Sequence, residues 1–170
     1  GEDPSAAGVN PGELLNRVAA FYHETFLETA APQAYLKSRG IDNPELYRVF
    51  KLGYAGGALL NTLPGKGPVI EALKKLGVLT KTGRELFYGC VIFPLFDSAG
   101  NVAGLYGRKI DDTARVRHLY LPGKRRGLFN RQAAASSAEI ILTESVIDAL
   151  SLCQNGFPNA VPLYGTGGLT

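Results

Sequence analysis

The last fifth of the chain, residues 139–170, constrains the fold more than any other segment. Four apolar or small residues, Ile140–Thr143, precede Glu144; a helical pattern then begins at Ser145, and a second apolar run spans Ala160–Tyr164. This order predicts a β–α–β unit with a carboxylate at the carboxyl end of its first strand. Because ligands of open α/β sheets collect outside those strand ends, Glu144 is in a position to hold a metal ion or to act as a base.

The segments before this unit predict short helices first and antiparallel strands afterwards. Asn10-Pro11-Gly12-Glu13 combines an N-cap, a proline at the first helical position and an acid in the first turn, and later helical patterns lie at 34–39, 43–50, 68–76 and 131–137. A glycine-rich loop is predicted at 53–57. Strands are predicted at 88–96, 102–110 and 115–121. The chain is therefore expected to have an α+β fold, in which a subdomain of helices and an antiparallel β-meander (residues 1–137) leads into a βαβ unit (residues 138–170).

Composition excludes several classes of protein. Apolar residues make up 45% of the chain and charged residues 19%, which is typical of a folded globular protein. No apolar run approaches the ~18 residues that span a bilayer and no signal peptide is present, so we expect a cytoplasmic protein without a membrane partner. With two cysteines, two histidines and no CxxC or CxxH pair, we expect free thiols and no zinc site. Methionine is absent even at position 1, which predicts a piece of a longer protein.

Positive charge gathers in one segment, residues 108–126, here called the basic window. Its only acids are Asp111 and Asp112. Either this is a solvated hairpin surface, or it is a footprint for nucleic-acid or nucleotide phosphates. Tyr106, His118 and Tyr120 lie among the charges, as a surface that binds bases requires. The candidate phosphate-binding residues are Arg108, Lys109, Arg115, Arg117, Lys124, Arg125 and Arg126.

Taken in order, several short motifs resemble the catalytic core of bacterial DnaG-type DNA primases, from its N-terminal subdomain into the start of its TOPRIM domain. The matching segments are Leu52-Gly53-Tyr54-Ala55 (family LGYA), Val91–Leu95 with Asp97 and Gly100 (IFPI–D–G), Gly104–Arg108 (G-F-G-G-R), Arg117–Tyr120 (K-Y-L-N), Gly127–Asn130 (L-Y-G), Glu144–Asp148 (E-G-Y-M-D) and Tyr164–Thr166 (L-G-T). Three departures, Cys90 for a basic residue, Arg117 for lysine and Ser145 for glycine, indicate a divergent primase of phage or plasmid type.

The resemblance implies an enzyme that makes RNA primers on a single-stranded DNA template from nucleoside triphosphates, with Mg²⁺ or Mn²⁺ and with a replicative helicase as a possible partner. Glu144 would be the general base or metal-associated acid. Asp148 is a second catalytic candidate, although Ser145-Val146-Ile147-Asp148 is also a capping box. Because the family's D-x-D motif is missing from these 170 residues, we expect them to be inactive alone. Two alternatives remain open: another TOPRIM enzyme (a topoisomerase or nuclease), and a non-catalytic single-stranded DNA-binding module of a mobile-element replication protein.

Overall fold

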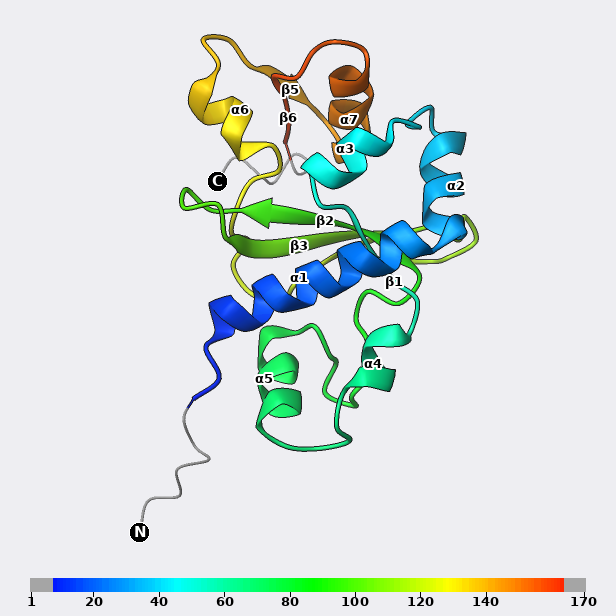
Figure 1. Cartoon of the computed structure of the whole chain (residues 1–170), viewed down its shortest axis with the longest axis vertical. Helices are drawn as coiled ribbons and strands as arrows, with labels where there is room; N and C mark the ends of the chain where they lie inside the picture. Colours follow the sequence, from blue (N-terminus) through cyan, green and yellow to red (C-terminus); the bar gives the residue numbers. More distant parts are fainter. Residues whose placement is uncertain (1–7, 164–170) are drawn as a thin grey trace.

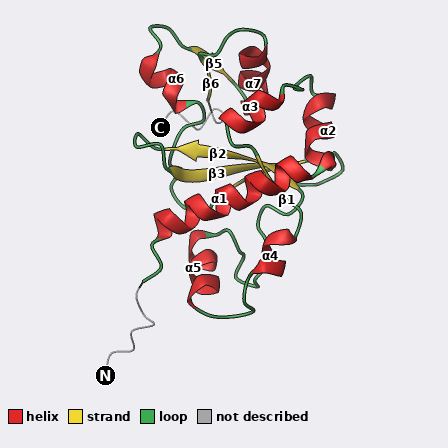
Figure 2. Ribbon diagram, viewed as in Figure 1, coloured by secondary structure: helices red, strands yellow, loops and turns green. Residues whose placement is uncertain are grey.

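A four-stranded antiparallel sheet, in the order β1-β2-β3-β4, forms the centre of the computed structural model, which describes residues 8–163 (Figures 1 and 2). A separate pair of parallel strands, β5 and β6, flanks α7. The strands are β1 (Gly53–Ala55), β2 (Cys90–Phe96), β3 (Val102–Lys109), β4 (His118–Tyr120), β5 (Ile141–Thr143) and β6 (Ala160–Pro162). The helices are α1 (Pro11–Glu28), α2 (Ala30–Ser38), α3 (Pro44–Val49), α4 (Ala58–Thr62), α5 (Pro68–Leu76), α6 (Arg131–Ser136) and α7 (Val146–Gln154).

Helix α1 begins where its capping residues predict. The side chain of Asn10 accepts hydrogen bonds from the backbone N–H groups of Gly12 and Glu13, at 3.0 and 3.2 Å. Such bonds satisfy donors that the first turn of a helix leaves without partners. The apolar stripe of α1 then packs across the sheet, as Figure 1 shows.

The two faces of the sheet belong to two different hydrophobic cores. On β2, Cys90 and Ile92 face the core that α1 and α5 complete, whereas Val91 and Phe93 face the core that includes α7. This alternation follows from the two-residue period of a strand. The second core packs the βαβ unit against the meander, and so fixes the position of the residues between β5 and α7.

The predicted βαβ unit is confirmed. Strands β5 and β6 pair in parallel, with Ile141 opposite Ala160, and α7 connects them. Polar side chains fasten this unit to the rest of the chain: Asn130 donates to the carbonyls of Pro158 and Ala160 at 2.9 and 2.8 Å, and Gln154 donates to the Gly40 carbonyl at 2.7 Å. The second core also crosses the predicted boundary near residue 137, and that boundary stays a prediction.

The α+β prediction is confirmed, but three local predictions were wrong. Residues 53–57 do not form only a loop, because Gly53–Ala55 is strand β1, paired with β2. Gly53 lies so close to α1 that a Cβ there would be 2.9 Å from the Cβ of Tyr22, so this glycine permits close packing. Helix α4 was not predicted, and α2 begins at Ala30 rather than at residue 34.

The sequence also predicts that the last strand extends to Tyr164, before the glycines Gly165–Gly168; these positions lie outside the described residues. No helix within residues 8–163 is both long and apolar enough to cross a membrane.

Candidate functional site

Glu144 directly follows β5 and precedes the first turn of α7, as the sequence predicts. Its carboxylate is exposed and has no hydrogen-bond or ion-pair partner among residues 8–163. It lines a pocket of about 270 Å³, here called the Glu144 pocket. The other lining residues are Tyr106, His118, Tyr120, Arg125, Ser145, Val146 and Leu163.

Strands β3 and β4 supply the wall of the pocket that lies opposite Glu144. In the antiparallel register Tyr106 is opposite Tyr120 and Arg108 is opposite His118. The Tyr106 ring lies 5.0 Å from the Tyr120 ring and 5.5 Å from the Phe93 ring, centroid to centroid. Because Val146 at the start of α7 shares a core with Phe93 and Tyr106, the packing of α7 brings Glu144 over this wall.

Positive charge surrounds the histidine in that wall. Partial burial lowers the pKa of His118, and the charges of Arg108 and Arg117 lower it further. Arg125 lies over the Tyr120 ring, 4.0 Å from its centroid, in cation–π geometry. Arg125 thus lines the pocket, and Arg108 and Arg117 add positive charge near His118, which suits an anionic ligand with a flat ring.

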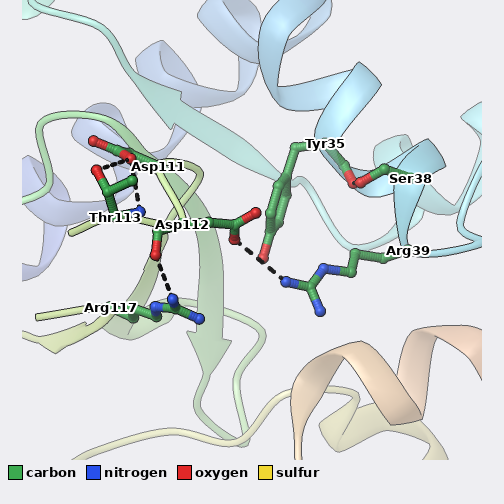
Figure 3. Close-up of polar contacts among 7 residues, drawn as sticks. All are labelled: Tyr35, Ser38, Arg39, Asp111, Asp112, Thr113 and Arg117. Atoms are coloured by element: carbon green, nitrogen blue, oxygen red, sulfur yellow. Dashed lines mark hydrogen bonds and ion pairs between the residues drawn. The ribbon is translucent and has the colours of Figure 1, made fainter. Parts of the chain in front are cut away.

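Two acids of the basic window shape the loop between β3 and β4 rather than neutralising its arginines (Figure 3). Asp111 accepts hydrogen bonds from the backbone and hydroxyl of Thr113, at 2.9 and 2.7 Å. The Asp112 carboxylate pairs with Arg39 of α2 at 3.6 Å, and the Asp112 carbonyl accepts a hydrogen bond from Arg117. Asp112 therefore connects Arg39 of α2 with Arg117 through its carboxylate and its carbonyl.

The remaining basic candidates divide into three groups. Lys109 donates to the Tyr88 carbonyl, a structural contact on the opposite face of β3 from Arg108. Arg115 is exposed in the β3–β4 loop. Lys124, Arg125 and Arg126 line a second, larger pocket of about 750 Å³ that reaches the start of α1. Arg125 and Tyr120 line both pockets, so the two pockets adjoin.

Asp148 acts as a capping residue. The Ser145 hydroxyl accepts from the Asp148 backbone N–H at 3.1 Å and donates to the Asp148 carboxylate at 2.8 Å. Asp148 is exposed and does not line the Glu144 pocket. The N-cap bond of Ser145 that the capping box predicts is confirmed, and a catalytic role for Asp148 stays a prediction.

Glu144 alone is a poor fit for a complete metal site. Mg²⁺ takes about six oxygen ligands, and the part of the chain that the structure describes contains no group of three or more His, Cys, Asp or Glu side chains able to hold a metal ion. The described residues therefore offer one carboxylate toward a metal ion.

Residues 21–135 match the family of DNA primase catalytic cores, at its N-terminal domain. The chain belongs to this family. The resemblance to DnaG-type primases is thereby confirmed, and catalysis in this family is metal-dependent in general.

Individual relatives agree with this family in sequence and in fold. A DNA primase of Aquifex aeolicus is 33% identical over 166 residues, which are 89% of this chain and 33% of the relative. A solved DNA primase domain from Pseudomonas aeruginosa is 31% identical with a TM-score of 0.77, covering 92% of this chain and 55% of that one. A solved DnaG primase catalytic domain bound to single-stranded DNA is 26% identical with a TM-score of 0.75, covering 92% and 56%. The chain spans about a third of the length of the curated relatives it matches.

The sequence predicts the residues of the pocket but not that they lie close together. The sequence places His118 among the basic residues, and the structure gives it a hydrogen-bond partner, the hydroxyl of Tyr106. The spacing of Tyr106, Arg108, His118 and Tyr120 on two paired strands was the available signal, because alternate residues share one face of a sheet. Nothing local connects that face to Glu144, which is 26 residues farther along the chain from His118.

Proposed function

We propose that this chain is the N-terminal part of a primase core, extending into a TOPRIM domain, and that the protein makes RNA primers on single-stranded DNA. In this proposal the Glu144 pocket receives a nucleoside triphosphate. Glu144 acts on the attacking 3′-hydroxyl, as general base or as one ligand of a Mg²⁺ or Mn²⁺ site. Such ions polarise the phosphoryl oxygens in nucleotidyl transfer.

One observation carries the proposal: the Glu144 carboxylate, which has no partner among residues 8–163, lines one pocket with three ring side chains of β3 and β4 and with Arg125. The arginines would bind phosphate oxygens, for which guanidinium geometry is suited, and Tyr120 with Arg125 would stack on a base. The solved DnaG domain bound to single-stranded DNA supports a DNA template for this chain too. A helicase partner and a cytoplasmic location stay predictions.

The template part of the proposal is tested by salt-dependent binding. For single-stranded DNA, the slope of log affinity against log salt is about −0.7 for each phosphate contact. If Arg108 and Arg117 each contact a phosphate, the Arg108→Ala/Arg117→Ala variant weakens binding and reduces the slope by about 1.4. The matched control, Lys66→Ala/Lys81→Ala, removes the same charge from two exposed positions outside the basic window. Equal slopes for the two double variants would exclude this footprint.

The catalytic part is tested at Glu144. In a protein that contains this chain together with a D-x-D motif, Glu144→Gln should lower the rate of primer synthesis by on the order of 100-fold or more and leave DNA binding unchanged. The 170 residues alone should make no primers, since two-metal transfer needs several carboxylates. Primer extension by these residues alone would show that the active site is assigned wrongly. DNA binding without nucleotide binding would favour the alternative of a non-catalytic module.

A further inference from the structure

His118 stands where the resembling family segment K-Y-L-N has tyrosine, and it faces the pocket in which the proposed function places a nucleotide. We propose that His118 donates its Nε2–H to a phosphate oxygen of that nucleotide, and that Tyr106 fixes the ring in the tautomer and orientation this requires. The inference rests on the proposed function and adds a specific phosphate contact to it.

Tyr106 is a rigid anchor for the histidine. Its side chain is only 4% exposed, and its ring stacks on Phe93 in the core beneath α7. Its hydroxyl is hydrogen-bonded to His118 Nδ1, and the two rings are tilted by only 10°. Burial raises the pKa of Tyr106 well above the ordinary tyrosine value, so the hydroxyl keeps its proton.

This bond selects the tautomer of His118. In the proposed arrangement the tyrosine donates and Nδ1 accepts, which gives the Tyr106 hydroxyl its acceptor among residues 8–163. A neutral imidazole that accepts at Nδ1 carries its proton on Nε2. The pKa of His118 lies below the ordinary 6.5, first because of burial and then because of Arg108 and Arg117, so the ring is neutral at pH 7. Nε2 lies on the side of the ring away from Tyr106, and none of the described residues accepts its proton.

The charges around the ring determine what kind of acceptor it meets. Arg108 is directly opposite His118 across the β3–β4 ladder, and Arg117 precedes it in the chain. Arg125 and Tyr120 line the same pocket, and Glu144 is the only acid among the described residues that line it. An N–H donor between guanidinium groups suits an anion with several oxygens, which a triphosphate provides and a nucleoside does not.

Imidazole ¹⁵N–¹H spectra of the 170-residue chain test the first step without any substitution. The chain has two histidines, and His23 serves as an internal reference, because its Nδ1 lies 2.7 Å from the Leu52 carbonyl and must be the donor. Two opposite tautomers are therefore expected, Nδ1–H for His23 and Nε2–H for His118. An Nδ1–H tautomer at both histidines would overturn the proposal.

Ligand titrations test the second step. Inorganic tripolyphosphate and ATP should both shift the His118 Nε2–H signal, adenosine should not, and the His23 signal should stay in place. His118→Phe keeps a flat ring but removes the donor, and should weaken tripolyphosphate and ATP by the same factor, about 10-fold or more. Its thermal midpoint is measured alongside, to confirm folding.

The outcomes distinguish an error in the His118 contact from an error in the nucleotide pocket. If the wild-type chain binds ATP and His118→Phe binds it equally well, the His118 contact is wrong and the nucleotide pocket survives. If the wild-type chain binds neither ATP nor tripolyphosphate, both fail. If ATP is weakened by His118→Phe but tripolyphosphate is not, the histidine contacts the sugar or base and the phosphate assignment is overturned.

Discussion

A buried hydrogen bond between α1 and the segment before β2 provides a sharp test of how this fold is stabilised. The Tyr22 hydroxyl, on a side chain only 1% exposed, donates to Glu85 Oε1 at 3.1 Å. Glu85 is 6% exposed, and its second oxygen, Oε2, has no partner among the described residues. The perturbation is Tyr22→Phe, which removes one oxygen and keeps the ring.

The pH dependence of the effect follows from the pKa of Glu85. Burial raises this pKa above its ordinary 4.5, and the hydrogen bonds from Tyr22 and the Gly57 backbone oppose the rise. A raised folded-state pKa means that the native state binds the proton more tightly than the unfolded state. The stability that Glu85 contributes is therefore fully present below pH 4.5 and is lost as the pH rises through the folded pKa.

Removing the Tyr22 hydroxyl should destabilise the protein more at high pH than at low pH. A hydrogen bond to a charged group contributes about 1.5–3 kcal/mol, and one between neutral groups about 0.5–1.5 kcal/mol. The first range applies at pH values above the raised pKa of Glu85, where the carboxylate is ionised, and the second at pH 4, below that pKa, where it is protonated. Each kcal/mol corresponds to a thermal midpoint shift of about 2–4 °C for a chain of this size.

The assay is urea and thermal unfolding of the wild type and Tyr22→Phe at pH 4, 6 and 8. Tyr88→Phe is the matched control, because it removes a hydroxyl from an exposed tyrosine. In a Glu85→Gln background, Tyr22→Phe should cost the same free energy at every pH. An equal loss at pH 4 and pH 8 in the Glu85 protein would refute the reasoning.

Two further predictions concern the βαβ unit and the thiols. Ser145→Ala removes the N-cap of α7 and should lower the free energy of unfolding by about 1 kcal/mol, measured by urea denaturation with Ser151→Ala, on the same helix but outside the cap, as the control. Cys90 is fully buried, and burial raises the pKa of its thiol to about 11; it should react with a thiol reagent only at the rate of unfolding, and fast modification in native buffer would contradict its placement in the core.

Local signals in the sequence were sufficient to predict most elements. The first and last turns of helices depend on nearby residues, so Asn10 and Pro11 predict the start of α1 correctly, and the helical pattern at 68–76 predicts both ends of α5. The hairpin between β2 and β3 and the order strand–Glu144–helix–strand are local for the same reason. These signals, combined with the order of the motifs, were also enough to indicate the primase family.

Local signals in the sequence thus predict the succession of elements, the position of Glu144 at a strand end and the accumulation of basic residues in one window. The packing of distant segments places Gly53 in a strand beneath α1 and sets Arg108 and Lys109 on opposite sides of the sheet. It also makes Glu144 face Tyr106 and His118. The position of Glu144 depends on how α7 packs on β2 and β3 through a shared core. Because burial of apolar surface is non-directional, no residue near Glu144 in the chain encodes this position.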